Sequence, residues 1–291
     1  KKRTFDYANA VDGMRQMLWG LFKKIVIADN CAVFANQIFG NSAELNGSTL
    51  ILGALFFTFQ IYGDFSGYSD IAIGTSRLFS FNLSRNFNFP YFSRDIAEFW
   101  RRWHISLSTW FRDYLYIPLG GNRVSTLRNY YNLIIVFLVS GLWHGANWTF
   151  VIWGALHGLY QVIHLQSKKI INPKQTQNVI RHFANITLVF SFVTFAWIFF
   201  RANSLNQAIE YINKMFEFDF SINLSQITAN VGILNLIISF SVILFLYISY
   251  LLPKNLNFQK EKYHLLFNIV TIFIIILIGI NGKAEFIYFQ F

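Results

Sequence analysis

The sequence has 291 residues, of which 54% are hydrophobic and 13% are charged, and its formal net charge is +10. Soluble domains carry about 25% charged residues, so this composition excludes an ordinary soluble domain and indicates a polytopic integral membrane protein. A chain that crosses lipid must satisfy its backbone hydrogen bonds internally, which predicts an all-α fold.

Basic residues in a membrane protein gather in its cytoplasmic loops. We therefore interpret the net positive charge as basic residues in cytoplasmic loops and in contact with membrane lipid. We expect no nucleic-acid partner. The single cysteine, Cys31, excludes an internal disulfide and a cysteine-cluster metal site. The sequence starts at Lys1 and shows no signal-peptide pattern, and we expect that an N-terminal part with further helices is missing from it.

Apolar windows in the first third of the chain predict complete and incomplete spans. Met14 to Phe39 is apolar but interrupted by two lysines and Asp29, so we expect a broken or partly interfacial helix. About 20 apolar residues span the hydrocarbon core. Leu45 to Gly63 is therefore a good span, whereas Ile71 to Phe81 is too short to cross alone.

Five later windows bring the prediction to roughly six or seven elements at membrane depth. They cover Tyr130 to Ser140, Asn147 to Leu165, Phe183 to Phe200, Ile227 to Leu252 and Tyr263 to Gly282. The fourth is long enough to cross with tilt, and Pro253 ends it. We expect one transmembrane domain over residues 1–291.

The segment from Arg77 to Arg128 is basic and aromatic. It holds eight arginines, no lysine and three acids, together with Trp100, Trp103 and Trp110. This composition indicates a cytoplasmic or re-entrant segment at the membrane interface. The tryptophans are three and seven residues apart, so on one helix they share a face. We expect a helix that lies along the membrane surface or dips into it.

His144 lies inside an uncharged run of 39 residues, in the motif Trp143-His144-Gly145-Ala146-Asn147-Trp148. Ionisable side chains at membrane depth are costly and mark functional sites. A neutral histidine accepts a proton from a hydroxyl near pH 7, which predicts general-base chemistry, with packing between helices as the alternative. On a continued helix Asn147 shares the face of His144 and would orient it.

A second histidine, His104, lies in the motif Glu98-Phe-Trp-Arg-Arg-Trp-His104-Ile-Ser-Leu-Ser108. The neighbouring arginines disfavour its charged form, which predicts a neutral base or hydrogen-bond partner, or else an interfacial histidine. Arg101 and Arg102 match the geometry of phosphate groups. They are candidate ligands for the phosphates of a donor substrate or of anionic lipid headgroups.

Two carboxylates continue from an apolar span in the motif Gln60-Ile-Tyr-Gly-Asp64-Phe-Ser-Gly-Tyr68-Ser-Asp70. Buried acids need partners, and we expect the later arginines to supply them. We interpret the motif as a structural polar network, with a substrate path lined by Asp64, Tyr68 and Asp70 as the alternative.

The remaining histidines are interpreted as structural. His157 and His164 are seven residues apart on one helix face, and no second pair of ligands accompanies them, so we expect no metal site. His182 and His264 lie at the edges of apolar windows, where amphipathic rings are common.

Long motifs in this sequence resemble the membrane-bound O-acyltransferase (MBOAT) family, in its bacterial branch of alginate and peptidoglycan O-acetyltransferases. The run Asp95-Ile-Ala-Glu-Phe-Trp-Arg-Arg-Trp-His-Ile-Ser-Leu-Ser-Thr-Trp-Phe-Arg-Asp-Tyr-Leu-Tyr-Ile-Pro-Leu-Gly-Gly-Asn-Arg123 carries the resemblance. The stretches 60–74, 141–148 and 286–291 fit the same branch. Teichoic acid D-alanyltransferases are more distant relatives.

The resemblance implies a ring of tilted helices around a tunnel, in the bacterial inner membrane. By this resemblance, the family's catalytic histidine corresponds to His144. The family's second catalytic position, which lies upstream and is polar, corresponds to His104. The resemblance also implies a cytoplasmic thioester donor, for which acetyl-CoA is our prediction, and no bound cofactor. It further implies a polysaccharide acceptor and a periplasmic SGNH-hydrolase-like partner.

The predicted function is therefore O-acetylation of an extracytoplasmic polysaccharide such as alginate, another exopolysaccharide or peptidoglycan. His144 is the predicted base, and His104 orients the reactants or stabilises developing charge. Arg101, Arg102 and Arg112 hold the donor or line its entrance, and Trp143 and Asn147 line the tunnel. A transporter or flippase with a buried proton-coupling network is an alternative function, and a scaffold for a catalytic partner is another.

Overall fold

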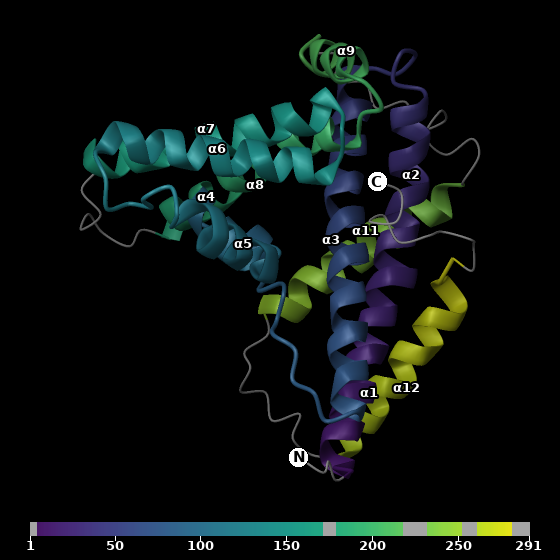
Figure 1. Ribbon diagram of the computed structural model, residues 1–291. Coiled ribbons are helices and arrows are strands. Elements are labelled where there is room, and N and C mark those ends of the chain that lie inside the picture. The colour runs from purple at the N-terminus through teal and green to yellow at the C-terminus, as the bar shows by residue number, and fades with distance from the viewer. Residues whose placement is uncertain (1–4, 171–178, 218–231, 252–260, 281–291) are drawn as a thin grey trace. The chain divides into compact units, whose positions relative to one another are not determined.

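The computed structural model describes residues 5–170, 179–217, 232–251 and 261–280, and within them it is all-helical (Figure 1). This confirms the predicted all-α fold. The chain divides into two compact units. Unit 1 comprises Lys1–Arg85 with Lys214–Phe291, and unit 2 comprises Asn86–Asn213.

Unit 1 is built around one long helix. It contains α1 (Tyr7–Leu21), the π-helical turn η1 (Phe22–Ala28), α2 (Asp29–Gly40), α3 (Gly47–Leu78), α11 (Ile233–Leu251) and α12 (Glu261–Ile278). The run α1–η1–α2 lies along α3 (Figure 1). Glycines permit this close approach, since a Cβ on Gly20 would lie 2.6 Å from the carbonyl oxygen of Gly67.

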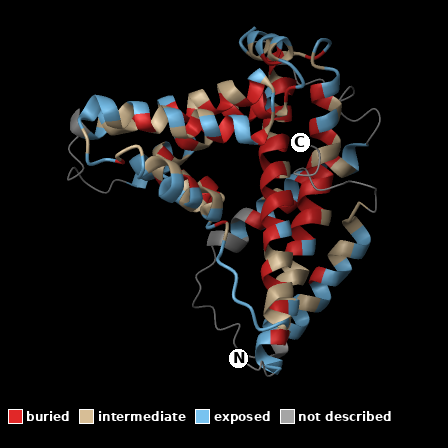
Figure 2. Cartoon of the chain, viewed as in Figure 1, coloured by how far each residue is buried: buried red, intermediate tan, exposed pale blue. Residues whose placement is uncertain are grey.

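The first apolar window is predicted to be a broken or partly interfacial helix, but it is helical without a break, and the π-helical turn η1, which carries both lysines, changes only the type of helix between α1 and α2. The prediction of two separate elements at 45–63 and 71–81 is wrong, because α3 runs unbroken through both. The polar residues between those windows contact buried lysines of η1, so the helix continues without a break. In unit 1 the buried residues follow η1 and the middle of α3 (Figure 2).

Unit 2 contains a helical hairpin preceded by short helical pieces. In chain order these are η2 (Pro90–Phe92), α4 (Ile96–Arg102), α5 (Ile105–Phe111), η3 (Arg112–Tyr116), α6 (Thr126–His144), α7 (Trp148–Ile170), α8 (Val179–Arg201) and α9 (Leu205–Met215). α6 and α7 pack through Gly141, Gly154 and Gly158. A side chain on Gly141 would overlap the backbone of Phe150, so the two helices lie in close backbone contact.

The predicted helix pair with His144 near its break is confirmed, since α6 ends at His144 and α7 begins at Trp148. α8 confirms the predicted helix at 183–200. α11 falls inside the fourth of the five later predicted windows, and α12 begins two residues before the last window and ends within it. Residues 227–231, 252, 253, 281, 282 and 286–291 lie outside the described residues.

Two of the described helices, α3 and α8, are long and apolar enough to cross a membrane. The count of six or seven elements at membrane depth stays a prediction. α6 exposes an apolar row at every third or fourth position, formed by Leu127, Tyr131, Ile135, Val139 and Leu142. A row of this kind suits contact with lipid.

The predicted single interfacial helix carrying three tryptophans on one face is wrong. α4 ends at Arg102, and the chain turns through His104 with a left-handed backbone, φ 42°. The turn sends Trp103 into the core, whereas Trp110 is 52% exposed.

Candidate active site

The C-terminus of α6 holds His144 inside a box of aromatic rings. His144 is 8% exposed. Its ring centroid lies 5.0 Å from that of its neighbour Trp143, 5.1 Å from that of Trp153 on α7 and 5.0 Å from that of Phe200 on α8. The site is therefore assembled by packing α8 against the α6–α7 hairpin.

His157 is a second, fully buried histidine on α7, at 0% exposed. The indole nitrogen Nε1 of Trp100 donates a hydrogen bond to its Nδ1 at 3.3 Å. Because an indole N–H only donates, Nδ1 must accept, and a neutral His157 carries its hydrogen on Nε2. That Nε2 has no hydrogen-bond partner among the described residues. This burial and hydrogen bond agree with the interpretation of His157 as a structural histidine, although the sequence alone did not identify Trp100 as its partner.

Tryptophans join the two histidines to the turn after α4. The ring of Trp153 contacts both histidines, with its centroid 5.0 Å from that of His157. Trp153 stacks on Trp197 of α8, with centroids 5.7 Å apart and planes 19° apart, and Trp197 contacts Trp103 at 5.1 Å. The indole nitrogens of Trp153 and Trp197 are buried, and neither has a hydrogen-bond partner among the described residues.

His104 is half-buried at the turn between α4 and α5. Its Nδ1 lies 3.2 Å from Oδ1 of Asn86, which also accepts hydrogen bonds from the backbone and side chain of Ser106 at 3.1 and 3.0 Å. Burial lowers the pKa of His104 to about 4, so the ring is neutral at pH 7. The neutral form agrees with the sequence prediction, but its cause is burial rather than the neighbouring arginines.

The two predicted catalytic histidines lie in the same compact unit. His104 and His144 are 40 residues apart in sequence, both belong to unit 2, and a positive charge on either ring would act on the other. A proton acceptor and a second neutral imidazole in one unit are the side chains that activation of a hydroxyl group requires.

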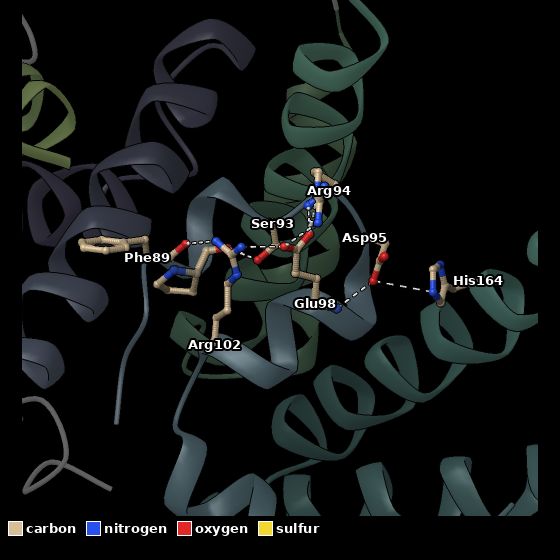
Figure 3. A network of polar contacts seen from close by, with 8 residues as sticks. Phe89, Ser93, Arg94, Asp95, Glu98, Arg102 and His164 are labelled. Carbon is tan, nitrogen blue, oxygen red and sulfur yellow. Dashed lines mark hydrogen bonds and ion pairs between the residues drawn. The ribbon is translucent and has the colours of Figure 1, made fainter. Parts of the chain in front are cut away.

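Glu98 anchors the helix that leads into His104 (Figure 3). Its buried carboxylate contacts Nη2 of Arg102 at 2.6 Å and Nε of Arg94 at 3.0 Å. Burial opposes ionisation, but the hydrogen bonds from Arg94 and the charge of Arg102 outweigh it and lower the pKa of Glu98. Asp95 caps α4 by accepting the N–H of Glu98 at 2.7 Å, and it faces Nε2 of His164 at 3.6 Å.

The other predicted site residues of unit 2 have different surroundings. Arg102 engages Glu98, whereas Arg101 and Arg112 are exposed, with Arg112 paired to Asp113 at 2.7 Å. Trp143 is 56% exposed.

The prediction that Asn147 shares a helix face with His144 is wrong, because the helix ends at His144. The Asn147 side chain instead accepts the N–H of Thr149 at 3.1 Å, at the start of α7, and donates to the carbonyl oxygen of Asn203 at 3.2 Å. Asn147 therefore helps to begin α7 and to hold the chain after α8.

Asp64 and Asp70 belong to unit 1, and their partners are lysines rather than the predicted arginines. Lys24 contacts Asp64 at 2.6 Å and Asp29 at 2.9 Å, and Lys23 contacts Asp70 at 2.5 Å. These contacts favour the interpretation as a structural polar network. Tyr68, between the two aspartates, is 45% exposed.

Comparisons with a family model and with individual proteins agree on one family. The model of the MBOAT, membrane-bound O-acyltransferase family matches residues 6–206. The chain is 47% identical over 216 residues to a probable alginate O-acetylase of Azotobacter vinelandii, covering 74% of the chain and 42% of that relative. It is 44% identical over 210 residues to a peptidoglycan O-acetyltransferase of Helicobacter pylori, covering 72% and 40%.

A more distant match is 35% identical over 181 residues to a teichoic acid D-alanyltransferase of Streptococcus thermophilus, covering 55% of the chain and 42% of that relative. The chain spans about two fifths of the length of the curated relatives that it matches. The family match covers both predicted catalytic histidines and most of unit 2. This chain is therefore a membrane protein that belongs to the membrane-bound O-acyltransferase family.

Proposed function

We propose that this chain catalyses transfer of an acetyl group from a thioester to an acceptor hydroxyl, so that an extracytoplasmic polysaccharide becomes acetylated either directly or through a partner protein. The observation that supports the proposal is that one compact unit of a chain from an O-acyltransferase family holds both His104 and His144, whose charges would interact. Acetyl is favoured over D-alanyl because identity and coverage are higher for the O-acetylases than for the D-alanyltransferase. Alginate, another exopolysaccharide or peptidoglycan is the proposed acceptor.

In the proposed reaction, a ring nitrogen of His144 takes the proton of the acceptor hydroxyl. The hydroxyl oxygen attacks the thioester carbonyl carbon, an ester bond forms, and the carbon–sulfur bond breaks. The proton then passes from His144 to the leaving thiolate, which restores the neutral ring. The aromatic box around His144 excludes water, which would otherwise compete with the hydroxyl for the thioester.

The donor is proposed to be acetyl-CoA, arriving from the cytoplasm. Arg101 and Arg112 are exposed cations in the basic segment and would contact its phosphates. Arg102 is assigned a structural role instead, because it is engaged with Glu98.

The proposed setting is the bacterial inner membrane, with several crossings and a tunnel between tilted helices. The apolar row along α6 would face lipid. A periplasmic SGNH-hydrolase-like protein is the proposed partner that passes the acetyl group to the polysaccharide.

The test compares His144→Ala with His182→Ala, a change to an exposed histidine on α8. Membranes with equal amounts of each protein are given isotopically labelled acetyl-CoA, and labelled ester on the polysaccharide is measured by mass spectrometry. General-base catalysis supplies about 10²–10⁴-fold, so His144→Ala should lose nearly all transfer while His182→Ala retains it.

Near-normal transfer by His144→Ala would reject His144 as the base. A transporter predicts movement of unmodified substrate without any labelled ester, so the same assay also separates that alternative. A scaffold predicts that His144→Ala keeps full transfer as long as the protein is present.

A further inference from the structure

The turn that carries His104 is held by a short neighbouring segment, residues 86–88. The N–H of Asn88 donates to the carbonyl oxygen of Arg102 at 2.9 Å, and the N–H of Ile105 donates to that of Asn86 at 3.0 Å. These two bonds bracket His104. Its left-handed backbone is unfavourable for a residue with a side chain, and such a conformation persists only where surrounding contacts hold it.

The contacts of Asn86 identify the atoms of its side chain. The backbone N–H of Ser106 lies 3.1 Å from Oδ1 of Asn86, and a backbone N–H is only a donor. The side-chain atom that faces it must therefore be the amide oxygen and not the amide nitrogen. The same oxygen also accepts from the Ser106 hydroxyl at 3.0 Å.

This oxygen then decides the tautomer of His104. It lies 3.2 Å from His104 Nδ1, and an amide oxygen only accepts. Nδ1 must therefore carry a hydrogen. A neutral imidazole has one N–H, so the lone pair of the ring is on Nε2.

We infer that Asn86 is a positioning residue that fixes His104 as the Nδ1–H tautomer, so that Nε2 serves as a hydrogen-bond acceptor during acyl transfer. The inference rests on the proposed function, in which His104 is the partner of His144. It decides between the two roles open to His104. A ring with its lone pair on Nε2 receives a hydrogen at that atom and does not donate one to the developing oxyanion.

Asn86 also caps α5, because its oxygen accepts the N–H of Ser106 in the first turn of that helix. Removing Asn86 would therefore impair the turn as well as the tautomer. Asn86→Asp separates the two effects, since a carboxylate oxygen still caps the helix but adds a negative charge beside Nδ1.

The added charge has a predictable sign. A carboxylate close to an imidazole favours the imidazolium and raises its pKa by about 1–3 units. The pKa of His104 starts at about 4, lowered by burial, so Asn86→Asp should bring it to about 5–7. Charged or titratable groups near Asn86 and His104 include Arg85, Arg101, Arg102 with its partner Glu98, and His144 at the end of α6, and none of them changes in the variant.

The experiment measures the pH dependence of acyl transfer from about pH 3 to 9 by the intact protein in membranes, a range that includes the wild-type pKa of His104 at about 4. For Asn86→Asp, we expect near-normal transfer at pH 8–9. The acidic limb of the pH–rate profile, where transfer falls because His104 becomes protonated, should move to higher pH by about 1–3 units. Asn86→Leu should lower transfer at every pH. Asn88→Asp places the same new charge at an exposed position two residues away, and its limb should stay in place.

An unmoved limb in Asn86→Asp, or normal transfer in Asn86→Leu, would overturn the role of Asn86. A direct readout needs no variant of Asn86. Solid-state NMR of the protein with ¹⁵N-labelled histidine, assigned by comparison with His104→Asn, should show protonated Nδ1 and bare Nε2 for His104. The opposite tautomer would overturn the inference.

These outcomes separate the inference from the proposed function. If His144→Ala and His104→Asn both abolish transfer and the limb of Asn86→Asp stays in place, the inference is wrong and the proposed function stands. If both histidine variants transfer normally, the proposed function is wrong, and the NMR tautomer still tests the contact between Asn86 and His104.

Discussion

The lysine network of unit 1 and the two buried histidines of unit 2 are both ionisable groups in the interior, but their surroundings differ. Unit 1 places lysines against carboxylates at 2.5–2.9 Å, so each charge has a counter-charge. Unit 2 surrounds His144 and His157 with aromatic rings, and Nε2 of His157 has no hydrogen-bond partner in the described residues. Paired charges suit a structural role, whereas available donors and acceptors suit chemistry.

The largest expected effect is on the stability of unit 1. Lys24→Ala removes the cation that contacts both Asp29 and Asp64, and breaking a buried ion pair costs about 3–5 kcal/mol. We expect a large loss of protein from membranes and a lower unfolding midpoint in detergent. Transfer should fall only in proportion to the protein lost, unlike in His144→Ala.

Asp12→Ala is the matched control, because it removes an exposed ion pair with Arg77 in the same unit. Exposed pairs contribute little, so this variant should resemble the wild type. Wild-type stability in Lys24→Ala would contradict the structural role assigned to the lysine network.

A smaller effect is expected from the hydrogen bond between Trp100 and His157. Replacing His157 by Phe removes the acceptor of the Trp100 indole, and an unsatisfied buried donor costs about 1–3 kcal/mol. The double variant Trp100→Phe with His157→Phe should be less destabilised than the sum of the single changes. Unfolding midpoints of the four proteins test this, and strict additivity would show that the bond contributes nothing.

The smallest effects distinguish two arginines. Arg102→Gln should lower stability and transfer together, because Glu98 loses a partner at 2.6 Å and α4 leads into His104. Arg112→Gln, at an exposed position, should leave the unfolding midpoint unchanged and raise KM for acetyl-CoA with little change in kcat. An unchanged KM in Arg112→Gln would remove it from the donor site.

Much of the architecture could be predicted from local patterns. The all-α fold followed from the scarcity of charge, and the break after α6 followed from the gap between the apolar windows at 130–140 and 147–165. The pairing of His104 with His144 came from the family resemblance and not from spacing. Local patterns are informative here because helices at membrane depth satisfy their own backbones.

The errors arose where a distant segment decides local structure. α3 continues through Asp64 and Asp70 because lysines from η1 reach them, and no pattern within α3 reports those lysines. The turn at His104 depends on backbone hydrogen bonds to residues 86–88. The helical spacing of the three tryptophans therefore wrongly predicted that they share one helix face. The hydrogen-bond partner of His157 could not be predicted either, because Trp100 lies 57 residues earlier in the chain.

The left-handed backbone at His104 also limits which amino acids can occupy that position. Histidine, asparagine and aspartate adopt this conformation more readily than most residues, and glycine adopts it freely. Alanine at this position therefore changes the backbone as well as the chemistry, and an effect of His104→Ala overstates the contribution of the imidazole. Among relatives, a replacement by asparagine would keep the turn and α5 in place while offering an amide to the reaction.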